Sequence, residues 1–283
     1  MKTLYLLLLC SLMNVIKAQH QKISVMFYHS ENFFIANDNS KKLGKTEALT
    51  TKQDCPDEIK HTATVIDTMG TNIELPALVG IYEEGKDNIN QKINSHYNLN
   101  QVDYAILNGE ITNTKGCKAR LLYDRNMFIL IESQIIKTSS GNSKTVDILF
   151  ATLILNSKEK VYVFVTEFSN EKAEDKTRID LAPFQKKINE LLQKDSHAKI
   201  IIMGSVNGSL IAGNENKWRA IDQIVLSNGI THNNKGLHLD GQSAFFEEEK
   251  LSSLNALAKV DTEGKSYSEK NNLSATLITL RLK

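Results

Sequence analysis

The sequence predicts an α/β sandwich, in which two packed and mostly antiparallel β-sheets are flanked by helices. Short apolar runs of strand length recur along the 283 residues, with alternating patterns and many branched side chains. Longer segments with apolar residues at helical spacing lie between some of these runs. Because the strands arrive mainly as hairpins with helices interspersed, two sheets packed face to face with outer helices would bury both kinds of apolar surface.

The apolar runs predict the elements in chain order. Strands are predicted at residues 23–28, 77–82, 102–107, 119–123, 128–133, 146–155, 160–168, 199–204 and 273–282. Helices are predicted at residues 57–69, 87–95 and 181–194. Two polar segments, residues 36–56 and 231–272, are predicted to be long loops. Loops of that length are either functional or variable surface insertions, and the second interpretation is favoured here.

The N-terminus predicts an export signal. Lys2 precedes an apolar run from Leu4 to about Ile16, and the small Ala18 is followed by polar chain. A retained membrane anchor needs about 20 apolar residues, and Lys17 ends this run too early. We therefore expect residues 1–18 to be removed, residues 19–283 to form one domain without a transmembrane segment, and the protein to be periplasmic, on the cell surface or secreted.

The charge balance gives no sign of a nucleic-acid partner. The whole chain carries a formal charge of +1, with 34 basic and 33 acidic side chains. Removal of residues 1–18 takes away Lys2 and Lys17, which leaves 32 basic side chains and a charge of −1. Such a chain lacks the basic field that attracts a phosphate backbone. We expect a monomer.

The cysteines leave the disulfide question open. Cys10 lies inside the export signal, with too short a stretch before it for a typical lipid-attachment site. Cys55 and Cys117 remain in the mature chain, which allows one disulfide in an oxidising compartment. Two free buried thiols are an equally good interpretation.

Seven stretches, in order, resemble the endonuclease/exonuclease/phosphatase superfamily, the group of pancreatic deoxyribonuclease, abasic-site endonucleases and inositol phosphatases. VMFYHSENFF resembles the opening V-M-F-Y-N-V-E-N-L-F of exported bacterial members, and IIIMGSVNG stands where the family carries G-D-F-N-D. The others resemble its G-L-x-E, A-L-L-Y-R-K-D-R-F, N-H-W-x-S-R, W-x-x-x-D-Q-I-x-V-S and Y-S-D-H motifs. The stretches are residues 25–34, 77–84, 119–128, 160–172, 200–208, 218–227 and 267–270.

The resemblance implies a four-layered sandwich with its site at one end of both sheets. Family members hydrolyse phosphoesters by in-line attack of water, assisted by a divalent cation and by hydrogen-bond donors to the phosphate. This chemistry needs a carboxylate for the hard cation, a group that orients or deprotonates water, and a positive donor near the phosphate. Mg²⁺ is therefore the cofactor that the resemblance implies, provided that the site survives.

Four family positions are kept. Asn32 matches the Asn that helps to hold the metal and its water, and Glu83 matches the metal-binding Glu, with Glu84 as the alternative in register. Asn207 matches the Asn that contacts the scissile phosphate, and Asp222 matches the Asp that orients the late His. Each has a structural alternative: a solvated acid at a strand end for Glu83, a turn cap for Asn207, and strand packing for Asp222. For Asp222 the structural role is favoured.

The positions that differ from the family motifs are those that transfer protons or stabilise charge in the family. Ser205 and Gly208 replace the two acids of G-D-F-N-D, and a hydroxyl cannot act as the water-orienting base near neutral pH. Thr166 and Glu167 replace N-H, so an anion stands where a phosphate donor is expected. At the late motif, Glu269 and Lys270 replace D-H. Because catalytic groups act as a unit, the loss of one of them removes most of the rate, and little hydrolysis is expected.

Other histidines could stand in for the two that are missing. His29 lies at the end of the first predicted strand, where a structural role is more common. His232 and His238 lie in a predicted loop and could form a weak metal pair, but with no third ligand nearby in the sequence they are better interpreted as surface residues.

Two functions remain open. The replaced residues favour a protein that is catalytically inactive or very weak and binds a partner, which could be a protein, a glycan or a phosphorylated ligand. The kept residues favour the alternative, an active Mg²⁺-dependent phosphodiesterase or nuclease with a rebuilt site. A purely structural role at the cell surface is a weaker third hypothesis.

Overall fold

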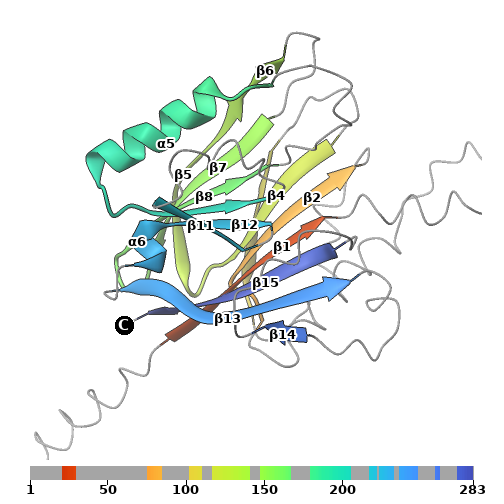
Figure 1. Ribbon diagram of the computed structural model, residues 1–283, viewed down its shortest axis with the longest axis vertical. Helices are drawn as coiled ribbons and strands as arrows, with labels where there is room; N and C mark the ends of the chain where they lie inside the picture. The colour runs from red at the N-terminus through yellow and green to blue at the C-terminus, as the bar shows by residue number, and fades with distance from the viewer. Residues whose placement is uncertain are drawn as a thin grey trace, which may run out of the picture.

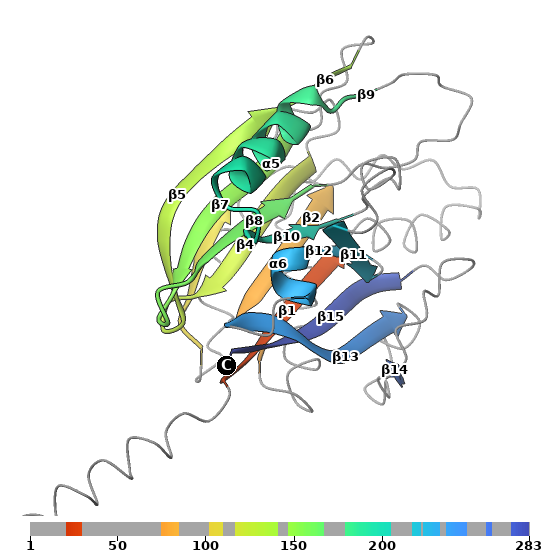
Figure 2. The same cartoon turned by 60° about the vertical axis from the view of Figure 1, so that its left-hand side comes forward.

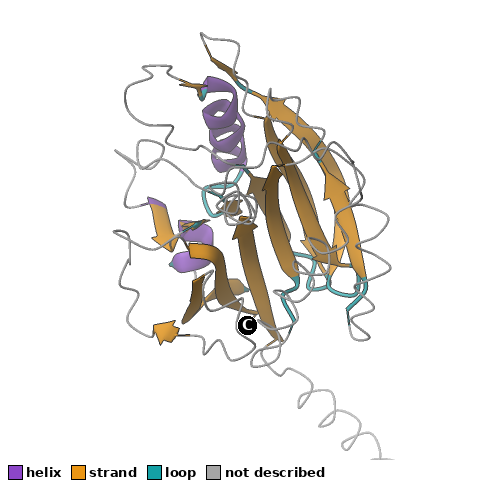
Figure 3. Ribbon diagram, turned by 90° about the vertical axis from the view of Figure 1, so that its right-hand side faces the viewer, coloured by secondary structure: helices purple, strands orange, loops and turns teal. Residues whose placement is uncertain are grey.

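A computed structural model describes eleven stretches of the chain, and the statements below concern these stretches. They are residues 21–29, 75–84, 102–109, 117–140, 147–166, 179–204, 217–221, 223–232, 236–247, 259–261 and 273–282. Two sheets face each other, and strands make up most of what is described (Figures 1 and 3).

The first sheet has seven strands in the order β14-β13-β15-β1-β2-β4-β3. Only the β1 and β2 neighbours run parallel, and the other described pairs are antiparallel. The strands of this sheet are β1 (Gln21–His29), β2 (Leu78–Glu84), β3 (Tyr104–Asn108), β4 (Cys117–Asp124), β13 (Leu237–Glu247), β14 (Lys259–Asp261) and β15 (Leu273–Leu282).

The second sheet has six strands in the order β11-β12-β10-β8-β7-β5, and again one pair, β8 with β10, is parallel. Its strands are β5 (Phe128–Lys137), β7 (Asp147–Leu155), β8 (Lys160–Val165), β10 (Lys199–Met203), β11 (Trp218–Ile221) and β12 (Ile224–Ser227). A small third sheet pairs β6 (Ser139–Ser140) with β9 (Ile179–Asp180).

Helix α5 (Ala182–Lys194) covers the outer face of the second sheet, as Figure 2 shows. Its buried stripe of Phe184, Ile188 and Leu191 has the spacing of one helix face. Phe184 meets the ring of Phe164 edge-on, with centroids 5.2 Å apart, an arrangement that aromatic pairs prefer. The shorter helix α6 (Asn228–Thr231) follows β12 directly.

The core lies between the two sheets, and side chains alternate between it and the outer faces. In β1, Ile23, Val25 and Phe27 belong to this core. Gly80 of β2 marks a close approach of the sheets, because a Cβ placed there would lie 2.8 Å from the Met203 sulfur of β10. A side chain at position 80 would therefore require the side chains of Met203 and Phe27 to shift.

Both faces of the seven-stranded sheet are covered. Ser24, Met26 and Tyr28 of β1 alternate with the core residues and so point to the outer face, yet all three are buried. Arg120 of β4 is also buried and lies on the same face. A sheet buried on both sides, packed on a second sheet that α5 covers, agrees with the predicted α/β sandwich.

The nine predicted strands and the helix at 181–194 are confirmed as strands β1 to β5, β7, β8, β10 and β15 and as helix α5. The prediction of a loop over residues 231–272 is wrong, because it contains β13 and β14. Strand β13 alternates only over residues 237–239, and a register shift between Leu239 and Ser243 then interrupts the pattern. The predicted helices at 57–69 and 87–95, the loop at 36–56, residues 1–18 and Cys55 lie outside the described residues.

No helix in the described stretches is long and apolar enough to cross a membrane.

Candidate functional site

The candidate site lies where four strands of the two sheets end together. Strands β1 and β2 are parallel neighbours in one sheet, and β8 and β10 are parallel neighbours in the other. The two pairs also point the same way. Lys199 at the start of β10 and Leu237 at the start of β13 both contact Glu159, and Leu237 pairs with Leu282, which pairs with Gln21 at the start of β1. The carboxyl ends therefore meet at the opposite end of the sandwich (Figure 1).

Three residues form a row across the strand ends in the six-stranded sheet. Val165, Met203 and Ile224 are register partners in β8, β10 and β12. The next row is Thr166, Gly204 and Gln223, held by two backbone bonds. The Thr166 N–H donates to the Met203 carbonyl at 2.9 Å, and the Gly204 N–H donates to the Gln223 carbonyl at 2.8 Å. We call Thr166, Gly204 and Gln223 the strand-end row.

Gly204 has to be glycine in this row. Its φ of +127° is a conformation that residues with a Cβ rarely adopt. A Cβ on Gly204 would also overlap the backbone carbonyl oxygen of Thr166, which cannot move aside as a side chain can. The chain therefore leaves β10 in a fixed direction toward Ser205, the first position beyond the described stretch.

The strand-end row contains two buried oxygen atoms without a hydrogen-bond partner. Thr166 is fully buried, and within the described stretches neither its Oγ1 nor the Oε1 of Gln223 has a hydrogen-bond partner. A buried polar atom without a partner costs about 1–3 kcal/mol, and such atoms are uncommon in native proteins. The sequence did not predict this feature, because it depends on the pairing register of three strands. Gly204 at a strand end was its one visible sign.

The seven-stranded sheet brings the predicted metal ligand to the same end. His29 of β1 pairs with Tyr82 of β2, and Glu83 and Glu84 are the last two residues of β2. The structure describes the backbone of Glu83, Glu84 and His29 but not their side chains. That Glu83 binds the metal therefore stays a prediction. The backbone of Glu83 lies at the end of the sandwich where the site is predicted.

Most of the other predicted positions follow these strand ends directly and lie outside the described residues. Glu167 follows Thr166, Ser205 follows Gly204, and Asp222 separates β11 from Gln223. Trp218 is described, and it is a partly buried residue of β11 that packs against the α5 side of the sheet. The remaining predicted positions outside the described residues are Asn32, Asn207, Gly208, Glu269 and Lys270.

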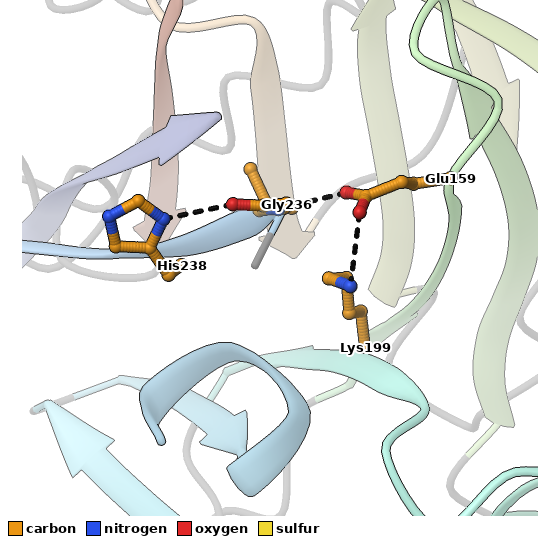
Figure 4. Close-up of polar contacts among 5 residues, drawn as sticks. Glu159, Lys199, Gly236 and His238 are labelled. Carbon is orange, nitrogen blue, oxygen red and sulfur yellow. Dashed lines mark hydrogen bonds and ion pairs between the residues drawn. The ribbon is translucent and has the colours of Figure 1, made fainter. Parts of the chain in front are cut away.

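Two of the alternative histidines lie at the other end of the sandwich. His238 donates from Nδ1 to the Gly236 carbonyl at 2.9 Å, and Glu159 accepts the neighbouring Leu237 N–H (Figure 4). Glu159 immediately precedes β8, whereas Thr166 immediately follows it. Six strand residues at about 3.3 Å each separate the two ends by roughly 20 Å. His232 directly follows α6, whose Gly229 lies against the backbone of His197 and Ala198 just before β10, and its Nδ1 bonds the Thr231 hydroxyl.

The donors at the candidate site fit a hard cation only in part. Magnesium prefers oxygen ligands, usually one or two carboxylates with several waters. At the described strand ends, the sequence has two acids, Glu83 and Glu84, at the end of β2, while the side chains of Thr166 and Gln223 in the other sheet carry only neutral oxygens. Among the described residues, no group of three His, Cys, Asp or Glu side chains could hold a metal ion. Glu83, with Glu84 as the alternative in register, therefore stays the predicted cation ligand.

Known proteins resemble the chain mainly in fold. A solved endonuclease/exonuclease/phosphatase from Bacteroides vulgatus has a TM-score of 0.55 at 11% identity, covering 93% of this chain and 100% of that one. A family protein from Bacteroides thetaiotaomicron has a TM-score of 0.52 at 8% identity, with 94% and 99% covered. D. rerio TDP2 complexed with a single-strand DNA product has a TM-score of 0.52 at 12% identity, with 92% and 99% covered.

No curated protein sequence matches the chain significantly. The model of the endonuclease/exonuclease/phosphatase family matches residues 24–213, which run from β1 past the end of β10 and include most of the chain. This chain, with its α/β sandwich and its strand ends in the family's order, therefore belongs to the endonuclease/exonuclease/phosphatase family.

Proposed function

We propose that this family member has a phosphoesterase site that is inactive or very weak, and that it acts by binding a ligand at the strand ends. The observation that carries the proposal is which residue types stand in the strand-end row and directly after it in the sequence. The backbone of β8 and β10 is built as a site requires, with Gly204 fixing the direction of the chain. In the sequence, Thr166 and Glu167 follow β8, and Ser205 follows Gly204 at the end of β10.

The chemistry of these residues supports weak hydrolysis. The hydroxyl of Ser205 cannot deprotonate water near neutral pH as a carboxylate can. Glu167 is an anion, and at about 4 Å and an effective dielectric of about 20 a like charge opposes a phosphate by roughly 4 kcal/mol. His232 and His238 lie too far from Thr166 to replace an imidazole there.

The proposal also includes export. Residues 1–18 have the basic start, apolar run and small residue of an export signal. The mature protein would then bind its ligand in the periplasm, on the cell surface or outside the cell. Cys55 and Cys117 could form a disulfide there, and the test is a mass shift on reduction and alkylation of the purified chain.

The alternative, an active Mg²⁺-dependent phosphodiesterase or nuclease, is favoured by one observation. Glu83 lies at the end of β2, beside the end of β1 and at the same end of the sandwich as Thr166 and Gly204. A carboxylate there could hold a cation that activates water. The retained Asn32 and Asn207 would complete such a site.

Hydrolysis assays separate the two functions. We expect the full chain to release little p-nitrophenol from bis(p-nitrophenyl) phosphate and to nick little plasmid DNA, with Mg²⁺ or Mn²⁺, and a Glu83→Ala variant to behave in the same way. Turnover that disappears in Glu83→Ala would overturn the proposal and establish the alternative. A melting shift with Mg²⁺ but without turnover, lost in Glu83→Ala, would show that the cation site outlived the chemistry.

The converse experiment restores the replaced groups. The combined substitutions Ser205→Asp, Glu167→His and Lys270→His return a base and two imidazoles to the aligned positions. Hydrolysis gained by this variant, and not by any single substitution, is the expected result because such groups act as a unit. Its absence would mean that the three positions do not face one another.

A further inference from the structure

The two unpartnered oxygen atoms of the strand-end row identify what kind of ligand group fits this site. Thr166 Oγ1 and Gln223 Oε1 are both buried, and their residues stand next to the ends of the two strands that flank β10. They do not bond each other, and they find no partner among the described residues. Because burial of a polar atom without a partner is unfavourable, a bound group that pairs with both atoms would remove that cost.

The two side chains lie on the same face of the sheet. Phe164, Ile202 and Val225 belong to the cluster on the α5 side, whereas the next residues, Val165, Met203 and Ile224, belong to the core between the sheets. Continued alternation places the strand-end row on the α5 side again.

The spacing of the row lets its two polar side chains reach a common atom. Neighbouring strands are about 4.8 Å apart, so the backbones of Thr166 and Gln223 are roughly 10 Å apart. Gly204 lies between them without a side chain. A single small group above Gly204 could therefore contact both.

The chemistry of the pair selects a neutral hydroxyl. The threonine hydroxyl can donate, and the side-chain oxygen of glutamine only accepts. With the Gln223 amide oriented as in the structure, a phosphate oxygen that accepts from Thr166 would face the glutamine oxygen with no proton to share. An alcohol accepts from one and donates to the other. We propose that Thr166 and Gln223 form a subsite for a neutral hydroxyl group, as carried by a sugar or polyol. This inference rests on the proposed binding function and names its ligand class.

Paired variants test the subsite with defined probes. Thr166→Val and Gln223→Met keep the approximate volume and remove the polar atoms. We expect myo-inositol to bind the wild-type chain saturably in calorimetric titration, and each variant to bind it about 3- to 10-fold more weakly, the loss of one neutral hydrogen bond. Inorganic phosphate is the comparison probe and should bind more weakly than myo-inositol.

A matched control distinguishes a binding role from a folding role. Thr152 is a buried threonine on the same face of the same sheet, but its hydroxyl donates to Glu132 at 3.0 Å. Thr152→Val should lower the melting temperature and leave myo-inositol binding unchanged. Thr166→Val should keep or raise the melting temperature, because it removes an unpartnered hydroxyl, and should weaken binding.

Three results would overturn the subsite. They are the absence of saturable binding of myo-inositol, glucose and glycerol; phosphate binding that is tighter and equally sensitive to both variants; and an ordered water bonded to both oxygens, with polyol binding unaffected by the substitutions. Turnover of bis(p-nitrophenyl) phosphate by the same preparation is scored separately. It would overturn the proposed inactivity and leave the titrations to decide the subsite.

Discussion

Glu159 and the strand-end row, which lie at opposite ends of the sandwich, treat their buried polar atoms in opposite ways. At the end where β8 and β10 begin, Glu159 accepts from Lys199 at 3.3 Å and from the Leu237 N–H at 2.8 Å, so its carboxylate joins the two sheets. At the end where the same strands finish, Thr166 Oγ1 and Gln223 Oε1 have no partner among the described residues. The bonds of Glu159 hold the two sheets together, whereas the strand-end row leaves two buried oxygen atoms unpartnered.

Both ends also depend on a glycine, but the two glycines meet different neighbours. Gly204 has a φ of +127° and faces a backbone carbonyl, while Gly236 has a φ of +70° and faces the carboxylate of Glu159. A backbone obstacle is fixed, whereas a side chain can rotate away. The comparison therefore predicts a larger cost for an added side chain at the ligand end than at the Glu159 end.

The largest effect is expected from Gly204→Ala. Backbone strain and a clash with the Thr166 carbonyl each cost about 1–3 kcal/mol, so the free energy of unfolding should fall by about 3 kcal/mol or more. Gly236→Ala is the matched variant and should cost about 1–2 kcal/mol. Urea unfolding of both measures the difference. Equal losses would show that the strand-end row is as adaptable as the Glu159 end.

An intermediate effect is expected from Glu159→Ala. The substitution leaves the Leu237 N–H, on a fully buried residue, and the mostly buried Lys199 without their acceptor. The loss should be about 2–3 kcal/mol in urea unfolding. Glu159→Gln keeps an acceptor for Leu237 and should cost less. Asp103→Ala, which removes an exposed ion pair with Arg125, should change stability little. If the Glu159→Ala variant is as stable as the wild type, Glu159 does not stabilise this end of the sandwich.

Local patterns predicted the strands well, and long-range pairing explains the failures. Strand β15 has the predicted bounds, 273–282, and α5 differs by one residue from its prediction, because alternation and helical spacing are local properties. Strand β13 was predicted as loop because pairing with β15, and not its own apolar pattern, defines it. The order of the motifs likewise predicts a site at one end of both sheets, and its location at these strand ends stays a prediction. The sequence could not predict that Thr166 and Gln223 lie in one row, because this depends on the register of β8, β10 and β12.

The smallest effect concerns Asp124, which ends β4 at the Glu159 end of the sandwich. Burial raises the pKa of its carboxyl above the ordinary value of 3.8, although the Asn126 N–H, 2.8 Å from Oδ1, acts to lower it. A raised pKa in the folded state means that this carboxyl adds stability below pH 3.8, and that this contribution is lost as the pH rises through the folded pKa. The Glu159 end therefore also holds an acid, Asp124, whose negative charge lowers the stability of the folded protein.

Asp124→Asn tests this point, because the amide oxygen can still accept from Asn126 and carries no charge. The variant should match the wild type in acid and become slightly more stable than the wild type as the pH rises through the folded pKa. Urea midpoints of both chains from pH 4 to 7 measure the effect. If the variant is less stable at pH 7, the charge of Asp124 is well compensated by its hydrogen bonds. Glu159 and Asp124 would then both be acids whose hydrogen bonds offset their burial. The contrast with the unpartnered oxygens of the strand-end row would be sharper.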